Sequence, residues 1–366
     1  MKVGEIVELL DGIAPPEYAM SGDSIGLQIG DPEQDVRQVI VTVDVTPAVV
    51  AEAVRKGADM LISHHPLIYT PLPSVRLDVY PQSLVYTLVC AKISHFAMHT
   101  NFDAADGGIN DVLADRLGLV DTKVLEPTHV EKSFKLVTFV PSEAVDAVRE
   151  ALADAGAGII GRYTHCSFQA PGTGTFEPME GAEPYIGNVG KQEKAPEYRL
   201  EMLVTEKTLH DAVSALLTAH PYEEVAYDVY PLKDPAKVAG IGRYGVLRAP
   251  MSFDGFCEMV KDVLSVEDAR VCGDPESRVS KVAVLGGSGG GSIGLAKSLG
   301  VDAFVTGDVR HHQFVEARAI GLNVIDATHF HTERPGMIAL APLLHDLLSS
   351  EGITVDYLDD EVLAGD

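Results

Sequence analysis

The feature that most constrains the fold is an internal repeat of a strand-like segment. Gly57–Ser63 (GADMLIS) and Gly300–Thr306 (GVDAFVT) share a glycine, an acidic residue, three apolar residues and a hydroxyl residue in the same order. Each is followed downstream by a histidine with an acidic residue four positions later, in His99–Asp103 (HTNFD) and His329–Glu333 (HFHTE). Several signals that recur in one order indicate a duplicated structural unit. We therefore expect two related α/β lobes with mixed sheets.

Local signals within each lobe alternate between strand and helix. Gln38–Val43 is rich in β-branched residues and predicts a strand. Thr46 as N-cap and Pro47 at the first helical position then predict a helix start, and Gly57 predicts its end. The second lobe follows the same plan, because Lys281–Leu285 predicts a strand and a glycine-rich loop leads into the next helix.

The middle of the chain has a different pattern, which predicts a separate inserted domain. Strand, helix and strand signals occur twice in succession there, as in a ferredoxin-like α+β domain. Within it we expect Ser142 to cap a helix and Gly158–Phe168 to be extended, and we expect Pro235–Gly242 to be the return linker. The predicted organisation is a first α/β lobe at 1–129, the insert at 130–235, and a second lobe at 236–366 that packs with the first.

Histidine and carboxylate side chains gather at the predicted strand ends, which is the pattern of a metal site. His64 and His65 end the first repeated strand, and an H-x3-acid segment follows a strand in each lobe. Consecutive strand residues point to opposite faces. The two histidines would therefore reach one ion poorly, but each could reach a different one of two adjacent ions. The alternatives are surface or capping histidines and polar loops.

The repeat makes a site for two divalent ions between the lobes the favoured interpretation. Imidazole and carboxylate ligands fit zinc, iron or manganese. Two adjacent ions activate water as a nucleophile near neutral pH, which implies hydrolysis of an ester, amide, amidine or phosphate bond. The candidate residues are His64, His65, His99, Asp103, His329 and Glu333.

Other motifs leave their roles open. His311, His312 and His331 are either residues around the site or solvated loop residues, and Asp308 is a candidate to accept a hydrogen bond from a metal-bound imidazole. The loop Gly286–Gly291 lies between a strand and a helix, where it either binds an anion or forms a tight turn with close backbone packing. We favour the tight turn because the lysine of a phosphate-binding loop is missing.

Composition excludes several classes of function. The chain has 366 residues, 46% of them hydrophobic, and a net charge of −26, which disfavours binding to nucleic acid. No apolar run reaches the roughly 18 residues that span a bilayer, so we expect no membrane association. The acidic start differs from a signal peptide, and the four cysteines are isolated, which favours a reducing cytoplasm.

With these motifs the chain resembles a known family, the Ngg-one-interacting-factor-three-like proteins with a dinuclear metal centre, often labelled GTP cyclohydrolase I type 2 homologs. The resemblance covers nearly the whole chain, and its insert is similar to the CutA/PII-like domain of the longer members. The matching outer stretches are Gly26–Asp31, Ile62–Leu67, His99–Ala105, Thr306–Asp308 with His311 and His312, and Ile325–Gly336; those of the insert are Cys166–Phe168, Gly172–Phe176 and His220–Val225.

The resemblance implies a ligand set, an assembly and an activity. It implies five metal ligands, keeps His99 beside the site without making it a usual ligand, and implies a toroidal homo-hexamer. We expect His99 to assist proton transfer or to orient the substrate. The family label implies a small-molecule substrate, possibly the nucleotide GTP. Two departures from the family pattern are Gly22-Asp23-Ser24 in place of Trp-Asp-Asn, and Thr328-His329 in place of Gly-His. The implied ligands are His64, His65, Asp103, His329 and Glu333.

Two classes of function remain open from the sequence. The first is a cytoplasmic metal-dependent hydrolase. The second is a metal-binding regulatory or scaffold protein without catalysis, in which the insert senses small molecules or supports oligomerisation.

Overall fold

The computed structural model describes residues 1–359 and divides into two compact units. The first unit combines 1–129 with 239–366, and the second comprises 130–238. Each is a mixed α/β or α+β body with its own hydrophobic core. The chain returns from the second unit to the first between Val238 and Ala239, within Pro235–Gly242, where we expected the return linker. This segment is not a loop throughout, because β10 begins at Lys237 and runs to Ser252, with its pairing to β12 starting at Arg243.

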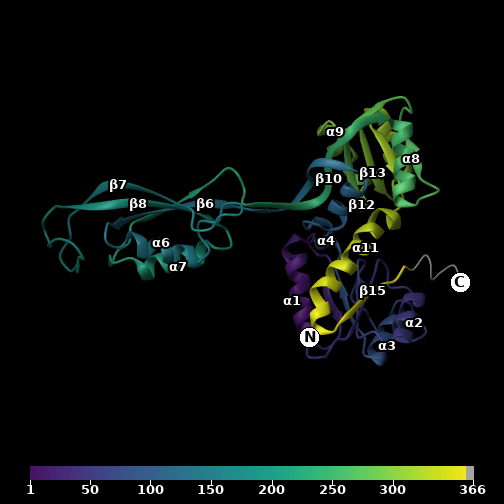
Figure 1. The fold of residues 1–366 in the computed structure, drawn as a ribbon, viewed down its shortest axis with the longest axis horizontal. Helices are drawn as coiled ribbons and strands as arrows, with labels where there is room; N and C mark the ends of the chain where they lie inside the picture. The colour runs from purple at the N-terminus through teal and green to yellow at the C-terminus, as the bar shows by residue number, and fades with distance from the viewer. Residues whose placement is uncertain (360–366) are drawn as a thin grey trace. The chain divides into compact units, whose positions relative to one another are not determined.

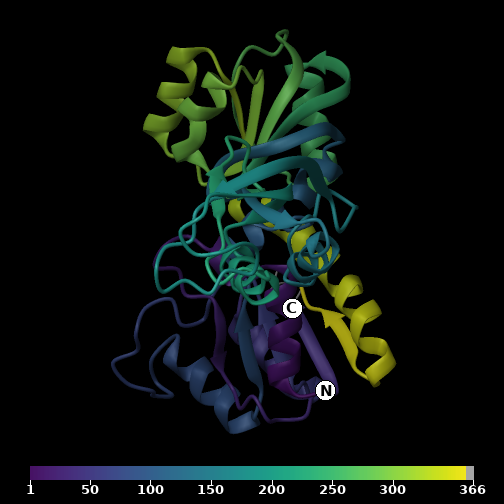
Figure 2. The ribbon, with the colours of Figure 1, turned by 90° about the vertical axis from the view of Figure 1, so that its left-hand side faces the viewer.

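The first unit holds a five-stranded and a six-stranded sheet (Figures 1 and 2). The five-stranded sheet has the order β1 (Gly26–Ile29), β4 (Ser94–Ala97), β3 (Met60–Ser63), β2 (Gln38–Thr42) and β15 (Thr354–Tyr357). The six-stranded sheet has the order β11 (Arg270–Cys272), β14 (Asn323–Asp326), β13 (Ala303–Gly307), β12 (Arg278–Ser288), β10 and β5 (Leu119–Glu131).

Besides the strands, this unit contains α helices and short 3-10 turns. Short 3-10 turns cover Pro16–Tyr18, Gly290–Ser292 and Ser349–Glu351. The helices are α1 (Val3–Ile13), α2 (Pro47–Lys56), α3 (Gln82–Ala91), α4 (Thr100–Ala104), α5 (Ile109–Arg116), α8 (Phe253–Leu264), α9 (Ile293–Ser298), α10 (His311–Ile320) and α11 (His329–Leu348).

The two sheets share their connectivity. Strands β2, β3 and β4 are parallel neighbours linked by α2 and α3, and β12, β13 and β14 are parallel neighbours linked by α9 and α10. In each sheet an earlier strand, β1 or β11, pairs antiparallel with the last of the three. The order of elements predicted from the repeated segment is therefore present in both sheets.

The acidic residue of the repeat has the same structural role in both copies. Asp59 Oδ2 accepts hydrogen bonds from the backbone N–H groups of Arg37 and Gln38 at 2.8 and 3.1 Å. Asp302 Oδ2 accepts from those of Ser280 and Lys281 at 2.9 and 2.8 Å. Each carboxylate thus satisfies two donors at the start of the neighbouring strand, which aligns that strand with the repeated one.

Helix boundaries in the first lobe follow the sequence signals. The Thr46 hydroxyl accepts from the N–H of Val49 at 3.2 Å, Pro47 is the first helical residue, and Gly57 ends α2 in the left-handed region with φ of 69°. Such local signals were correct here because each acts on its own turn of helix.

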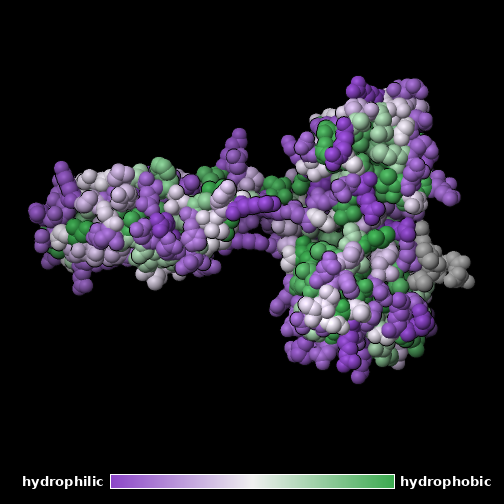
Figure 3. Space-filling model, in the orientation of Figure 1, coloured by the Kyte–Doolittle hydropathy of each residue, from purple (hydrophilic) through white to green (hydrophobic). Residues whose placement is uncertain are grey.

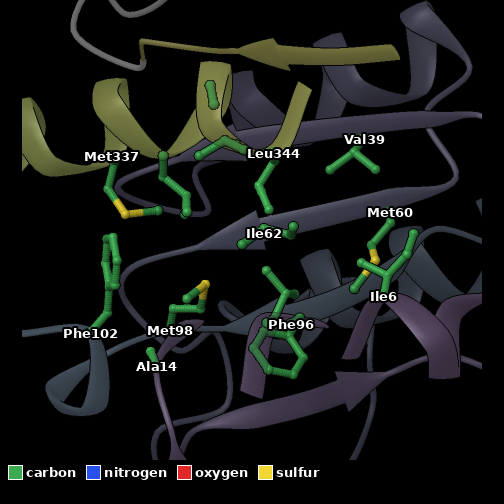
Figure 4. Packing of buried hydrophobic residues seen from close by; sticks show 14 of the residues in the cluster. Ile6, Ala14, Val39, Met60, Ile62, Phe96, Met98, Phe102, Met337 and Leu344 are labelled. Carbon is green, nitrogen blue, oxygen red and sulfur yellow. The ribbon is translucent and has the colours of Figure 1, made fainter. Parts of the chain in front are cut away.

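Helix α11 joins the two lobes. It contacts β2 and β15 of the first sheet and also β12 and β13 of the second. Figure 4 shows Leu344 of this helix pointing toward Ile62 of β3 and Met337 lying beside Phe102, and all four residues are buried. The two sheets are therefore held together by a shared element rather than by a surface contact alone.

The second unit is one antiparallel sheet with two helices. The elements are β6 (Ser133–Pro141), α6 (Val145–Asp154), β7 (Ser167–Phe176), β8 (Glu193–Thr205), α7 (Leu209–Ala219) and β9 (Tyr227–Pro231), and the strand order is β7-β8-β6-β9. This is the β-α-β-β-α-β succession. Figure 1 shows α6 and α7 on the same side of the sheet, where they form its core.

Two local expectations for this unit were wrong. The N-cap of α6 is Ala144, without a side-chain hydrogen bond, so Ser142 does not cap it. Strand β7 begins only at Ser167, so most of Gly158–Phe168 is irregular. A hydroxyl residue near a helix start is a common cap, but the turn before α6 places Ser142 too far from the first free N–H groups.

The surface of both units is mixed in character. Figure 3 shows hydrophilic residues over much of the visible face, interrupted by smaller hydrophobic areas. Within residues 1–359, no helix combines the length and the apolar character needed to cross a bilayer.

The packing of α11 is testable by a pair of neighbouring leucines. Leu344 is fully buried between the helix and the first sheet, whereas Leu343 is 44% exposed. Leu344→Ala should lower the free energy of unfolding by about 2–5 kcal/mol because it leaves a cavity, and Leu343→Ala should change it by less than about 1 kcal/mol. Urea unfolding followed by circular dichroism measures both. Equal effects of the two substitutions would contradict this packing.

Candidate metal centre

His64 and His65 lie at the end of β3, where the strand ladder continues past its last residue. The N–H groups of His64 and His65 donate to Thr42 O and Val43 O at 3.2 and 3.0 Å. The hydroxyl of Ser63 donates to His65 O at 2.6 Å. The backbone of both histidines is therefore fixed by the neighbouring strand, with His64 fully buried and the His65 side chain 24% exposed.

Four imidazoles at this edge are oriented in the same way. In each, Nδ1 donates to an oxygen that can only accept, which leaves Nε2 available as a ligand in the neutral ring. A metal-binding imidazole is commonly held by such a partner. The pairs are His64 with Met98 O at 2.8 Å, His65 with Asp44 at 2.7 Å, His99 with Asp23 at 2.8 Å, and His329 with Asp308 at 2.8 Å.

Glu333 lies among three of these imidazoles. Its Oε1 is 3.1 Å from His329 Nε2 and 3.4 Å from His64 Nε2, and its Oε2 is 3.2 Å from His65 Nε2. The two ring nitrogens His65 Nε2 and His329 Nε2 are 3.1 Å apart. The side chain of Glu333 is only 3% exposed. Donor atoms from both lobes thus converge around one buried carboxylate.

The H-x3-acid segments lie on helices rather than at the ends of strands or in loops. His329 is the first residue of α11 and Glu333 follows one turn later, and residues four apart share one face of a helix. In the first lobe, His99 is the N-cap of α4 and Asp103 lies within that helix. The histidine and the acidic residue of each motif are therefore brought together by one turn of a helix. The expectation that both side chains come from strand ends was wrong.

Two groups of three side chains could each hold a metal ion. One comprises His64, His65 and His99, and the other His65, His329 and Glu333; within each group the ligand atoms lie within 4.8 Å of one another. Asp103 belongs to neither group, although its Oδ1 is 3.9 Å from His64 Nε2. His99, which the family pattern places outside the ligand set, lies inside one group.

The polar atoms of this cluster fit a divalent ion. Three of its buried atoms make no hydrogen bond within the described part of the chain: His64 Nε2, Asp103 Oδ1 and Glu333 Oε2. Buried polar atoms without a partner destabilise a fold by about 1–3 kcal/mol each. Nitrogen and carboxylate oxygen donors of this kind are the ligands that zinc, iron and manganese use.

The carboxylates and imidazoles of this cluster shift one another's pKa values. The Glu333 carboxylate raises the pKa of His329 to about 9. Burial lowers the pKa of His65, but contacts with Asp44 and Glu333 outweigh burial and raise this pKa to about 10. Burial raises the pKa of Asp103 to about 6. Burial also acts to raise the pKa of Glu333, yet the surrounding imidazoles hold that pKa well below its usual range.

The glycine-rich loop after β12 packs against this cluster. Gly287 has φ of 70°, and a Cβ added there would overlap Glu333 Oε1 and lie 3.3 Å from His329 Nε2. A Cβ at Gly289 would overlap Thr306 Oγ1, which accepts from the N–H of Gly289 at 2.9 Å. The loop is thus a tight turn with close backbone packing, as favoured from the sequence, and its glycines leave room for the ligand side chains.

Three further histidines of the second lobe, His311, His312 and His331, have other surroundings. His311 and His312 are exposed at the start of α10, and His331 Nδ1 contacts the hydroxyl of Thr328 at 2.8 Å. None of the three belongs to either candidate metal group among residues 1–359.

Thr328 occupies a backbone conformation that normally requires glycine. Its φ of 62° and ψ of 158° are essentially restricted to glycine and cost of order 1–3 kcal/mol for other residues. The family pattern has glycine at this position, so this chain retains the conformation with a side chain that strains it.

Two carboxylates of the site were missed by sequence reasoning. Asp23 and Asp44 hold His99 and His65, yet they lie far from these residues in sequence. Burial raises the pKa of Asp23, but hydrogen bonds from His99 and Thr100 outweigh burial and hold this pKa far below its usual range. Asp23 could have been considered because it is the acidic residue in the altered Gly22-Asp23-Ser24 motif, whereas no signal marks Asp44.

Gly287 provides a test of the loop packing. Gly287→Ala should displace the Glu333 carboxylate and weaken divalent-metal binding by at least about ten-fold, the effect of losing one well-placed neighbour of a metal site. Gly300→Ala is the control, because Gly300 has a similar φ of 71° but open space around its Cβ. Competition with a chromogenic chelator measures both affinities. Equal losses in the two variants would attribute the effect to backbone strain alone.

The raised histidine pKa values predict how pH affects metal binding. His65 and His329 are protonated in the metal-free protein below about pH 9, and a metal ligand must lose that proton. Metal affinity should therefore rise from pH 6.5 to 8.5, by about ten-fold per pH unit for each proton released. Titration calorimetry in buffers of different ionisation enthalpy counts the protons, and an affinity that is independent of pH would refute the assignment.

Comparisons with known proteins identify the family. The protein named GTP cyclohydrolase 1 type 2 homolog from Bacillus subtilis (strain 168) is 43% identical over 326 residues, which is 89% of this chain and 87% of that protein. A protein of the same name from Mycobacterium tuberculosis is 38% identical over 339 residues, covering 92% of this chain and 89% of its own length.

Solved structures agree over almost the whole chain. A Bacillus cereus protein related to NIF3 matches with a TM-score of 0.83 and 41% identity, covering 98% of this chain and 96% of that one. Staphylococcus aureus protein SA1388 matches with a TM-score of 0.82 and 29% identity over the same shares. The resemblance noted in the sequence is thereby confirmed. A family model matches residues 1–360, and the chain belongs to the Duf34/NIF3 (NGG1p interacting factor 3) family.

Proposed function

We propose that this protein is a metal-dependent hydrolase that binds two divalent ions between its lobes. The proposed ligands are His64, His65, Asp103, His329 and Glu333. The observation that carries the proposal is the Glu333 carboxylate at 3.1, 3.2 and 3.4 Å from the Nε2 atoms of three imidazoles whose Nδ1 atoms are already held. Zinc, iron and manganese suit this donor set.

The side chains of the site differ in their exposure to solvent. His64 and Glu333 are almost fully buried, whereas the side chains of His65, His99 and His329 are 24, 20 and 35% exposed. A small substrate would therefore approach from the side of these three rings. Bound divalent ions would lower the pKa of a water molecule, which makes it a nucleophile near neutral pH, and would polarise the bond to be broken.

His99 is the proposed proton-transfer group. Asp23 accepts the Nδ1 proton of His99, which fixes the ring and keeps Nε2 free to take up or release a proton. The ring centroid of His99 lies 5.2 Å from that of His64 and 5.6 Å from that of His65. This position lets His99 act on a substrate held beside the ligands while remaining tied to the protein through Asp23.

The name shared by the relatives makes GTP the first substrate to test. Opening of the purine ring by water with release of formate is a hydrolysis of the class the site supports. The family resemblance also leads us to propose a homo-hexamer and a cytoplasmic location. The equal connectivity of the two sheets and the matching roles of Asp59 and Asp302 support duplicated lobes, and the β-α-β-β-α-β succession supports a CutA/PII-like insert.

Variants of the site separate ligands from the proton-transfer group. Protein purified without chelator should contain about two divalent ions per chain, and His64→Ala with Asp103→Ala should lose them. His99→Gln should keep its metal but lower the rate of formate release from GTP by about 10²–10⁴-fold. His312→Ala, which changes an exposed histidine outside both groups, should alter neither quantity. Elemental analysis and a formate assay measure these outcomes.

The same experiment decides against the alternatives. Loss of metal in His99→Gln would make His99 a ligand. Hydrolysis of phosphoester or amide substrates in place of GTP would keep the hydrolase but exclude the cyclohydrolase. Full metal content without turnover of any of these substrates would favour a regulatory or scaffold protein, in which the insert acts as sensor or oligomerisation module.

A further inference from the structure

The second unit contains a cavity that is unrelated to the candidate metal centre. It has a volume of about 780 Å³, within the range of small-molecule sites. It lies on the sheet face opposite to α6 and α7: along β8, Leu200 and Met202 face the helices, whereas Glu197 and Arg199 line the cavity. Phe139, the β6 partner of Arg199 in the ladder, lines it as well.

Aromatic rings form much of the wall. Tyr222 lies 6.2 Å from Phe176 and 6.0 Å from Tyr185, measured between ring centroids. Tyr222 is itself held by its neighbour, because its N–H donates to His220 Nδ1 at 3.1 Å while His220 Nε2 donates to Phe139 O at 3.0 Å. The His220–Glu224 motif thus positions an aromatic wall.

A nearly buried carboxylate faces this space. Glu197 is only 7% exposed, and its Oε1 accepts the hydroxyl proton of Tyr222 at 2.8 Å. Its Oε2 lies against Gly174, where an added Cβ would overlap it. Burial, followed by the hydrogen bond to Glu197, raises the pKa of Tyr222 above its usual range, so Tyr222 keeps the proton that it donates to Glu197. A buried carboxylate normally has a cationic partner.

The charges that line the cavity favour a cation. Four glutamates, Glu177, Glu197, Glu223 and Glu224, line the cavity together with one arginine, Arg199. Arg199 Nε already donates to Glu201 at 2.7 Å. The aromatic faces add negative electrostatic potential, which attracts cations. An anionic ligand would meet both the carboxylates and the ring faces.

We propose that this cavity binds a small organic cation, a protonated amine or amidine with an apolar body. Its N–H groups donate to Glu197, and its body packs against Phe176, Tyr185 and Tyr222. Two features favour this class: the Glu197 carboxylate accepts hydrogen bonds, and the rings of Phe176, Tyr185 and Tyr222 line the same cavity. The site is independent of the hydrolase proposed for the first unit.

Binding to the full-length protein tests this site with probes of one shape and different charge. Benzamidine and benzylamine should bind with measurable affinity by titration calorimetry, whereas neutral benzyl alcohol and anionic benzoate should bind at least about ten-fold more weakly, the usual effect of losing a hydrogen bond to a charged group. Equal binding of benzyl alcohol, or no binding of either cation at millimolar concentration, would overturn the proposal.

Variants locate the binding within the cavity. Glu197→Gln keeps the shape and removes the charge, and should weaken benzamidine binding by at least about ten-fold. Gly174→Ala should have a similar effect, because its Cβ would push aside only the flexible end of Glu197 and leave the fold intact. Glu180→Gln removes one charge from an exposed residue of the neighbouring loop that does not line the cavity, and should bind as the parent does. Unchanged binding in both Glu197→Gln and Gly174→Ala would refute the site.

Discussion

The crossing of α11 from one sheet to the other is the constraint on which the candidate metal centre depends. The helix packs Met337 and Leu344 against the first sheet while its first turn follows β14 of the second. This geometry carries Glu333 and His329 to the end of β3, where His64 and His65 emerge. Without that crossing each lobe would hold only part of the set of donor atoms.

Carboxylate and carbonyl oxygens around the site determine which nitrogen of each imidazole is available. In each of the four rings Nδ1 donates a hydrogen bond to a fixed oxygen, so that the four Nε2 atoms are available as ligands at the site. Asp23, Asp44 and Asp308 lie in different segments of the chain. Their hydrogen bonds fix the orientation of the rings of His99, His65 and His329 without requiring a metal ion. Contacts of His65 with Asp44 and Glu333, and of His329 with Glu333, raise the pKa values of these two rings.

The parts of the fold that could be predicted are those with local causes. The start and end of α2 follow from Thr46, Pro47 and Gly57, because each acts through its own backbone conformation or hydrogen bond. The β-α-β-β-α-β succession of the second unit was visible for the same reason. Ser142 misled because the helix begins later, with Ala144 as its N-cap. Pro235–Gly242 does contain the return between the two units, but its strand conformation from Lys237 onward was not visible in the sequence.

By itself, the sequence determined the repeated strand segments, the recurring H-x3-acid pattern and the family, since these depend on residue order. Only the tertiary structure decided which donors meet. It placed His99 within one candidate group and Asp103 at its margin, brought Asp23 and Asp44 to the rings, and set Gly287 against Glu333. It also revealed the acidic aromatic cavity of the second unit. The physical reason is that a site is built from distances between atoms far apart in the chain, and those distances follow from the packing of α11 and the sheets.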